Sequence, residues 1–199
     1  MNQQNFTCYN CKHSNQFGTL FCSHCQSIQP ISEKNYFKIF SLQLNFSLDK
    51  NKLEENYLNL QKLLHPDNFQ QKSAIELNLA LQHTSMVNEA YLNLKSDLKR
   101  SEYLLKIENI IVNQDNKSSI SPDNDLLNYI FNLRDEIEDI EGQQELKAIK
   151  ENIKKEVINI IKELEQLFTK KQYDVIAKLT IKLRYLEKIQ EELEIKLAL

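Results

Sequence analysis

The stretch Leu63-Leu64-His65-Pro66-Asp67-Asn68-Phe69 lies between two helical patterns and decides how the first half of the chain folds. Apolar residues recur at helical spacing over residues 49–64 before it and over residues 74–94 after it. Pro66 has no amide proton and disfavours the α conformation at the preceding residue, so we expect the first helix to stop there. The sequence therefore predicts a helical hairpin whose turn displays an imidazole and a carboxylate.

This turn resembles the J-domain of DnaJ-class co-chaperones, in which a His-Pro-Asp tripeptide stimulates ATP hydrolysis by a seventy-kilodalton heat-shock chaperone of the DnaK or HscA type. The resemblance implies that His65, Pro66 and Asp67 bind the chaperone, with Lys62 on the preceding helix beside them. J-domains commonly present a basic face on that helix, and here lysines are mixed with Glu54 and Glu55. The alternative is an ordinary loop in which Asp67 only caps the next helix.

The composition favours long helices in one or two modest domains. The chain has 199 residues with only 2 glycines and 3 prolines, which leaves little material for β-turns. The net charge of −3 gives no general attraction to nucleic acid or to an anionic membrane surface. No apolar run approaches the roughly 18 residues that a membrane span needs, so we expect a soluble protein.

All four cysteines lie near the start, in Cys8-Tyr9-Asn10-Cys11 and Cys22-Ser23-His24-Cys25. Two CxxC pairs are typical of a tetrahedral thiolate site, and we predict one structural zinc ion held by Cys8, Cys11, Cys22 and Cys25. Two redox disulfides or an iron–sulfur site are the alternatives.

A shell of four sulfur ligands leaves no open position for catalysis, although His13 and His24 could substitute as ligands. So short a module cannot bury a core, and the metal should supply its folding energy. Lys12 is the only lysine or arginine before Lys34, which argues against phosphate binding.

Residues 26–32 are predicted to be a linker, followed by a short helix over residues 33–40 with Ser32 as its cap. The aromatic residues of this helix should pack on the hairpin. Ser47 or Asp49 should cap the first hairpin helix, and His83 is interpreted as a packing residue of the second.

After a polar linker, three helical patterns cover residues 124–141, 143–168 and 173–197. Gly142 is expected to end the first of them. Amphipathic helices with short connections predict an antiparallel three-helix bundle, with an intermolecular coiled coil as the alternative.

Two apolar residues of the first bundle helix do not belong to its core stripe. Leu127 and Phe131 each follow a core position by one residue and share a face with Asp135, and Asp139 continues that row. Tyr185 is similarly displaced on the third helix. These residues form either a widened core stripe or an exposed apolar site with an acidic border.

Further stretches make the resemblance more specific: Tyr36-Phe37-Lys38-Ile39-Phe40, Val87-Asn88-Glu89-Ala90-Tyr91 and Leu98-Lys99-Arg100-Ser101-Glu102-Tyr103-Leu104-Leu105. Together with the tripeptide they resemble the HscB-type iron–sulfur cluster co-chaperones. The double CxxC resembles the eukaryotic, mitochondrial branch of that family.

In HscB-type proteins the bundle binds the iron–sulfur scaffold protein, of the IscU type. The resemblance implies a scaffold site made of Leu127, Phe131, Arg134, Asp135, Asp139 and Tyr185. Asn128 and Asn132 depart from the bacterial pattern, in which an apolar residue and an acid stand.

The expected protein is all-α, with a zinc module over residues 1–30, a J-domain with its following helix over 33–106, a linker over 107–123 and the bundle over 124–199. The expected function is that of a co-chaperone which delivers the scaffold protein to the chaperone, stimulates its ATPase and promotes cluster transfer. A J-domain protein with a different client and a zinc-thiol redox adaptor are the alternatives.

We expect no enzyme, because the sequence has no glycine-rich phosphate loop, nucleophile elbow or HExxH motif. The resemblance implies the mitochondrial matrix, with the cytoplasm as second candidate, and it leaves room for a homodimer. The residues before Cys8 contain no arginine and do not form a recognisable transit helix.

Overall fold

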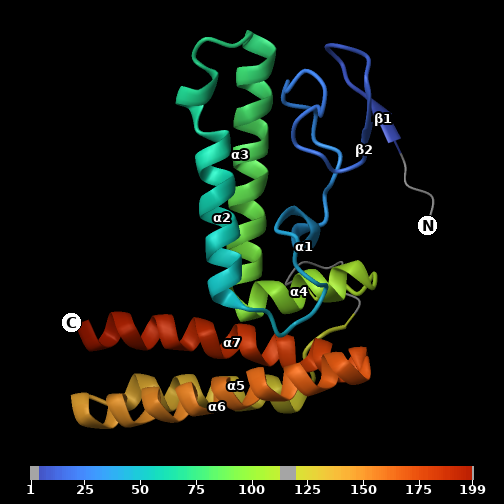
Figure 1. Cartoon of the computed structure of the whole chain (residues 1–199). Helices are drawn as coiled ribbons and strands as arrows, with labels where there is room; N and C mark the ends of the chain where they lie inside the picture. The colour runs from blue at the N-terminus through green and yellow to red at the C-terminus, as the bar shows by residue number, and fades with distance from the viewer. Residues whose placement is uncertain (1–4, 113–119, 199) are drawn as a thin grey trace. The chain divides into compact units, whose positions relative to one another are not determined.

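The computed structural model describes residues 5–112 and 120–198, which form mainly helices (Figure 1). Its elements are β1 (Asn5–Thr7), β2 (Ser14–Gln16), α1 (Tyr36–Ile39), α2 (Lys50–Leu64), the 3₁₀ turn η1 (Pro66–Phe69), α3 (Ala74–Lys95), α4 (Asp97–Ile107), α5 (Asn124–Asp139), α6 (Gln143–Lys170) and α7 (Tyr173–Ala198). The predicted all-α architecture is confirmed, with one short strand hairpin added at the amino-terminal end. Among the described helices, none is both long and apolar enough to cross a membrane.

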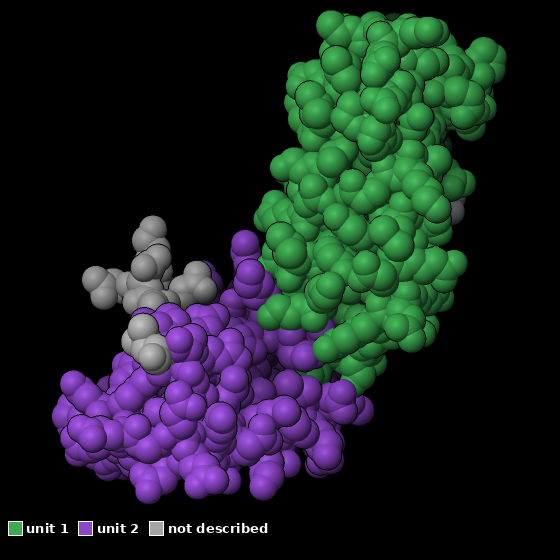
Figure 2. Space-filling model, turned by 90° about the vertical axis from the view of Figure 1, so that its left-hand side faces the viewer, with its two compact units in different colours: residues 1–96 green, residues 97–199 purple. Residues whose placement is uncertain are grey.

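The chain divides into two compact units, residues 1–96 and 97–199 (Figure 2). This division places α4 in the second unit, whereas the sequence grouped it with the hairpin; the limits of the functional domains stay a prediction. Part of the predicted linker, residues 113–119, lies outside the described residues, as do residues 1–4 and 199 of the terminal modules.

In the first unit, the segment predicted to be a linker is in fact packed. Ile28 and Gln29 are fully buried, and Ile28 forms an isolated β-bridge with Phe21. The prediction of a linker over residues 26–32 is therefore wrong. Pro30 indicated a break in regular structure, but a break in regular structure can still be buried.

The short helix α1 starts later than predicted. Asn35 caps it by accepting hydrogen bonds from the amides of Phe37 and Lys38, at 3.0 and 3.3 Å. The expected cap, Ser32, instead accepts a hydrogen bond from the amide of Gly18 at 3.1 Å. The expected packing of aromatic residues is confirmed for Phe37, which is fully buried.

The hairpin of α2 and α3 forms as predicted. Asp49 caps α2, and Ser73 caps α3 in a reciprocal capping box with Glu76. Between the helices, the Asn88 side chain accepts hydrogen bonds from Tyr57 at 3.1 Å and from Gln61 at 2.6 Å. A polar contact thus accompanies the apolar packing of the hairpin.

In the second unit, α4 packs on α7 through polar groups. Ser101 and Thr180 are fully buried and share a hydrogen bond of 2.6 Å. Arg184 of α7 pairs with Glu102 of α4 at 2.6 Å and also donates to the carbonyl of Val112. The chain just after α4 is therefore fixed against the bundle.

The three-helix bundle of α5, α6 and α7 folds within one chain, so the alternative of an intermolecular coiled coil is wrong for these helices. Of its predicted core positions, Ile130 and Ile137 on α5 and Leu186 on α7 are buried, whereas Leu126, Leu133 and Leu179 are only partly buried. Gly142 does not end α5, because the helix stops at Asp139 and Gly142 precedes α6. The carbonyls of Ile137 and Glu138, left open at that end, accept hydrogen bonds from the ammonium group of Lys196 at 2.6 and 2.9 Å.

Candidate functional site

Two turns with the same hydrogen bonds hold the four cysteines. Cys8 and Cys22 each donate their amide to the carbonyl five residues ahead, at 2.8 and 2.9 Å. The carbonyl oxygens of Cys8 and Cys22 each accept a hydrogen bond from the amide four residues ahead, at 3.1 and 3.0 Å. Lys12 and Gln26 occupy equivalent positions in these turns with φ of 63° and 58°. The repeated turn brings the thiols of each CxxC pair toward the same point.

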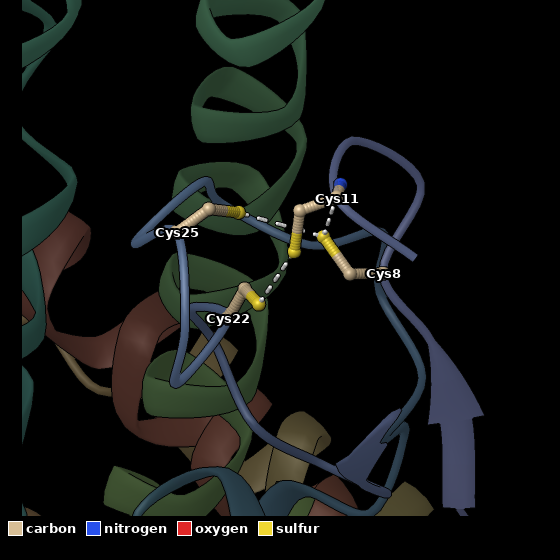
Figure 3. A group of neighbouring side chains, drawn as sticks. All are labelled: Cys8, Cys11, Cys22 and Cys25. Carbon is tan, nitrogen blue, oxygen red and sulfur yellow. Dashed lines mark hydrogen bonds between the residues drawn. The ribbon is translucent and has the colours of Figure 1, made fainter. Parts of the chain in front are cut away.

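The sulfur atoms of the two turns meet in one cluster (Figure 3). Cys8 Sγ lies 3.7 Å from Cys25 Sγ, and Cys11 Sγ lies 3.7 Å from Cys22 Sγ. All four sulfur atoms lie within 4.8 Å of one another, and none forms a disulfide. A tetrahedral zinc site with Zn–S bonds of about 2.3 Å has sulfur–sulfur edges of about 3.8 Å. The cluster therefore fits one metal ion with four thiolate ligands.

The surroundings favour the ionised form of Cys25 and oppose that of Cys11. Hydrogen bonds from the Ser27 side chain and backbone lower the pKa of Cys25 to about 6. A backbone hydrogen bond at His13 favours the Cys11 thiolate, but burial and the other three sulfur atoms raise the pKa of Cys11 to about 12. A bound cation would remove this opposition, since it favours every thiolate at once.

The histidines considered as substitute ligands stand apart from this cluster. The rings of His13 and His24 are exposed and stack on each other with centroids 5.3 Å apart. Among the described residues, the group able to hold a metal consists of the four cysteines.

The His-Pro-Asp turn is exposed and held by its own neighbours. The side chains of His65 and Asp67 are 61% and 69% exposed. Asn68 donates to the carbonyls of Lys62 and Leu63, at 2.7 and 3.3 Å, and so caps the end of α2. The turn is therefore bonded to the end of α2 while its imidazole and carboxylate remain accessible.

The alternative role of Asp67 as a helix cap is wrong. The residue that caps α3 is Ser73, and Asp67 accepts its side-chain hydrogen bond from Gln70 at 3.0 Å. Phe69 is buried and anchors the turn to the hairpin. Lys62, on the last turn of α2, is exposed.

On α5, the two displaced apolar residues are exposed. Leu127 is 41% and Phe131 64% exposed, although they follow the core positions Leu126 and Ile130. A widened core stripe would bury both side chains, so that alternative is wrong for them. An exposed pair of large apolar side chains on one helix face is typical of a partner site.

Tyr185 lies on the face of α7 that contacts α5. It stands seven residues from Lys178 and from Glu192, so the three share one helix face. Lys178 pairs with Asp123 at 3.9 Å, and Glu192 pairs with Arg134 at 2.9 Å. Because one end of this row binds the cap of α5 and the other binds α5 itself, Tyr185 belongs to the face of α7 that is turned toward α5.

The two ion pairs also bracket Leu127 and Phe131. Asp123, Leu127, Phe131 and Arg134 follow one another at spacings of four, four and three on α5, which is a single helix face. We call Leu127, Phe131 and Tyr185 the apolar strip. It lies between the Asp123–Lys178 and Arg134–Glu192 ion pairs.

The polar residues predicted at the border differ in their contacts. Arg134 binds Glu192 through two nitrogen atoms, at 2.9 and 3.2 Å, and so holds α5 against α7. Asp135 and Asp139 are exposed. The structure thus gives Arg134 an intramolecular role and leaves the two acids on the surface.

Comparison with known proteins agrees with these features. A family model described as the HSCB C-terminal oligomerisation domain matches residues 122–194. The iron–sulfur cluster co-chaperone protein HscB of Mus musculus is 29% identical over 94% of this chain and 81% of its own length. The HscB homologue of Arabidopsis thaliana is 31% identical over 96% of this chain and 74% of its own length. The chain belongs to the HscB co-chaperone family.

The HscB fold extends over nearly the whole chain. The crystal structure of human co-chaperone protein HscB matches with a TM-score of 0.87 and 27% identity, over 96% of this chain and 98% of that one. The resemblance drawn from the His-Pro-Asp turn and the double CxxC is thus confirmed. The HscB relatives are named as co-chaperones, which supports a role other than catalysis for this member.

The sequence did not predict the two ion pairs between α5 and α7 that flank the apolar strip. The seven-residue spacing of Lys178, Tyr185 and Glu192 was the available signal, because it marks one face of α7. Sequence reasoning also missed a partner of His83, whose Nε2 lies 2.8 Å from the carbonyl oxygen of Gln29. No local pattern connects residues 54 positions apart.

Proposed function

We propose that this HscB-family member binds an iron–sulfur scaffold protein and delivers it to a seventy-kilodalton heat-shock chaperone, whose ATPase it stimulates. His65, Pro66 and Asp67 contact the chaperone, with Lys62 beside them. Leu127, Phe131 and Tyr185 contact the scaffold protein, with Asp135 and Asp139 at the border. Arg134 acts chiefly by fixing α5 to α7.

One observation carries this proposal: two exposed groups of residues lie in different compact units of one chain. The turn presents polar groups that its own backbone holds in place, which lowers the entropy lost on binding. The apolar strip presents large side chains whose burial in a partner would be favourable. A chain that binds both partners raises the local concentration of the client at the chaperone.

The four cysteines are proposed to hold one structural zinc ion. The sulfur geometry supports this assignment, and a closed shell of thiolates gives the ion a role in folding.

A mitochondrial location is proposed from the eukaryotic relatives that match nearly the whole chain. Self-association stays a prediction, which sedimentation of the purified protein would check.

A paired set of variants tests the function. His65→Gln should abolish stimulation of the chaperone ATPase and leave scaffold binding unchanged. Leu127→Ala combined with Phe131→Ala should weaken scaffold binding at least about tenfold, because truncation of hot-spot residues commonly costs more than 1.4 kcal/mol each. The same pair should leave basal ATPase stimulation without scaffold protein unchanged.

The control is Ile158→Ala, which truncates an apolar side chain of α6 that is also exposed, at 44%, but lies outside the strip. It should retain both activities. Full ATPase stimulation by His65→Gln would refute the assignment of the turn. Unchanged scaffold affinity of the double variant, with stimulation intact, would indicate a J-type co-chaperone for another client.

A further inference from the structure

The tetracysteine module is joined to helix α3 by a continuous series of hydrogen bonds. Ser27 is almost fully buried. Its carbonyl oxygen accepts a hydrogen bond from the amide of Cys22 at 2.9 Å, and its hydroxyl lies 3.4 Å from Cys25 Sγ. The Gln29 side chain donates to that same carbonyl at 2.7 Å. The second cysteine turn therefore fixes the position of Gln29.

Gln29 is in turn bound to the hairpin. Its carbonyl lies 2.8 Å from Nε2 of His83 on α3. Because a carbonyl only accepts, Nε2 must carry the proton in this contact. Burial lowers the pKa of His83, which keeps the ring neutral near neutral pH, while the bond to Gln29 acts in the opposite direction. His83 is thus a donor to the module, and its predicted role as a simple packing residue is incomplete.

The junction contains an unfavourable feature as well. Gln29 is fully buried, and its Oε1 is the one buried side-chain oxygen or nitrogen of the described residues that has no hydrogen-bond partner. An unsatisfied buried oxygen favours opening of the structure around it. The contacts that hold Gln29 in place must therefore outweigh this cost.

A cavity beside the junction leaves room for movement. Its volume is about 230 Å³, and His83, Met86 and Leu64 line it on the hairpin side. Gly18 and Leu20 line it on the module side. Leu64, which also directly precedes His65, is fully buried on the hairpin side of this cavity.

We propose that the tetracysteine module is a metal-dependent brace for helix α3, and that the Gln29–His83 hydrogen bond transmits the state of the cysteine cluster to the hairpin. The metal joins the two cysteine turns, and the second turn positions Ser27 and Gln29. Loss of the metal releases Gln29 and loosens α3 around His83. This inference rests on the zinc site of the proposed function and does not depend on the chaperone contact.

Hydrogen–deuterium exchange on the full-length, zinc-loaded protein tests the brace. Removal of zinc with a chelator should speed amide exchange in α3 around His83 at least about fivefold, the factor that corresponds to one net hydrogen bond. Helices α5 to α7 belong to the other compact unit and serve as the internal control, with unchanged exchange.

Two substitutions at one position separate transmission from general destabilisation. His83→Gln keeps a side-chain N–H donor and should respond to the chelator as the natural protein does. His83→Leu has no donor; it should still bind one zinc ion, but exchange in α3 should already be fast and change less than twofold on zinc removal.

Zinc release without faster exchange in α3 of the natural protein would overturn the brace, as would equal behaviour of the two variants. These outcomes are distinct from a failure of the proposed function. A chain that binds no zinc contradicts the zinc site itself, and a chain that fails to stimulate the chaperone contradicts only the assignment of the turn.

Discussion

At the scale of single residues, Asn88 joins the two helices that display the His-Pro-Asp turn. Its side-chain oxygen accepts hydrogen bonds from Tyr57 and from Gln61 of α2. Removal of this acceptor leaves two partly buried donors unsatisfied, which is more costly than the loss of the bonds themselves. The Asn88 amide therefore adds a polar contact to the apolar packing of α3 against α2.

Asn88→Ala is expected to lower the free energy of unfolding by about 1 kcal/mol, the lower end of the cost of unsatisfied buried donors, because both donors are only partly buried. Urea denaturation followed by circular dichroism would measure it. Asn93→Ala is the matched control, since Asn93 lies on the same helix and only donates to the carbonyl of Glu89 at an exposed site. A loss as large in the control would show that helix propensity, and not the hairpin contact, accounts for the effect.

Several residues with local signals were predicted correctly from the sequence, whereas partners distant in the sequence were not predicted. Pro66 and Asp49 acted through their immediate neighbours, so the end and the start of α2 could be predicted. Arg134 stays a predicted border residue of a partner site, but its ion pair with Glu192, 58 residues away, was not predicted. His83 differs from the prediction for the same reason, because its partner Gln29 is distant in the sequence.

At the scale of elements, the outward face of α2 differs from a strongly basic helix. Leu58 and Leu63 are 48% and 52% exposed on the same helix as the exposed Lys62. Glu55 is also exposed, and its negative charge offsets the positive charge of Lys62. If the proposed chaperone contact includes this helix, apolar burial contributes to it beside charge.

We therefore expect the chaperone contact to depend weakly on salt. Stimulation of the ATPase should fall less than about threefold between 50 and 300 mM salt, since salt screens exposed charges but does not weaken apolar contact. Leu58→Ala with Leu63→Ala should reduce stimulation more than Lys62→Ala does. A steep loss of stimulation with salt, together with an inert leucine pair, would show that charge alone drives the contact.

The ends of the helices show why sequence patterns predict the presence of a helix better than the residues at which it begins and ends. Gly142 was expected to terminate α5, but the helix had already ended at Asp139. Lys196, on α7, donates hydrogen bonds to the open carbonyls of Ile137 and Glu138, and no local pattern indicates this contact. The start of α1 was also predicted at the wrong residue, because Asn35 and not Ser32 caps this helix.

At the scale of the whole molecule, the two proposed binding sites lie in separate compact units. A variant that loses one site should therefore keep the other. An adaptor with an intact client site but no chaperone site still occupies the scaffold protein, because binding at the strip does not require the turn. Such a variant should interfere with the natural protein.

Equimolar His65→Gln, added to the natural protein at limiting scaffold concentration, should lower scaffold-dependent ATPase stimulation about twofold, since half of the scaffold is then held by chains that cannot engage the chaperone. His65→Gln combined with Leu127→Ala and Phe131→Ala should not interfere, because it no longer holds scaffold. The chaperone ATPase assay measures both mixtures. Equal interference by the triple variant would mean that the two sites do not act as separate ends of one adaptor.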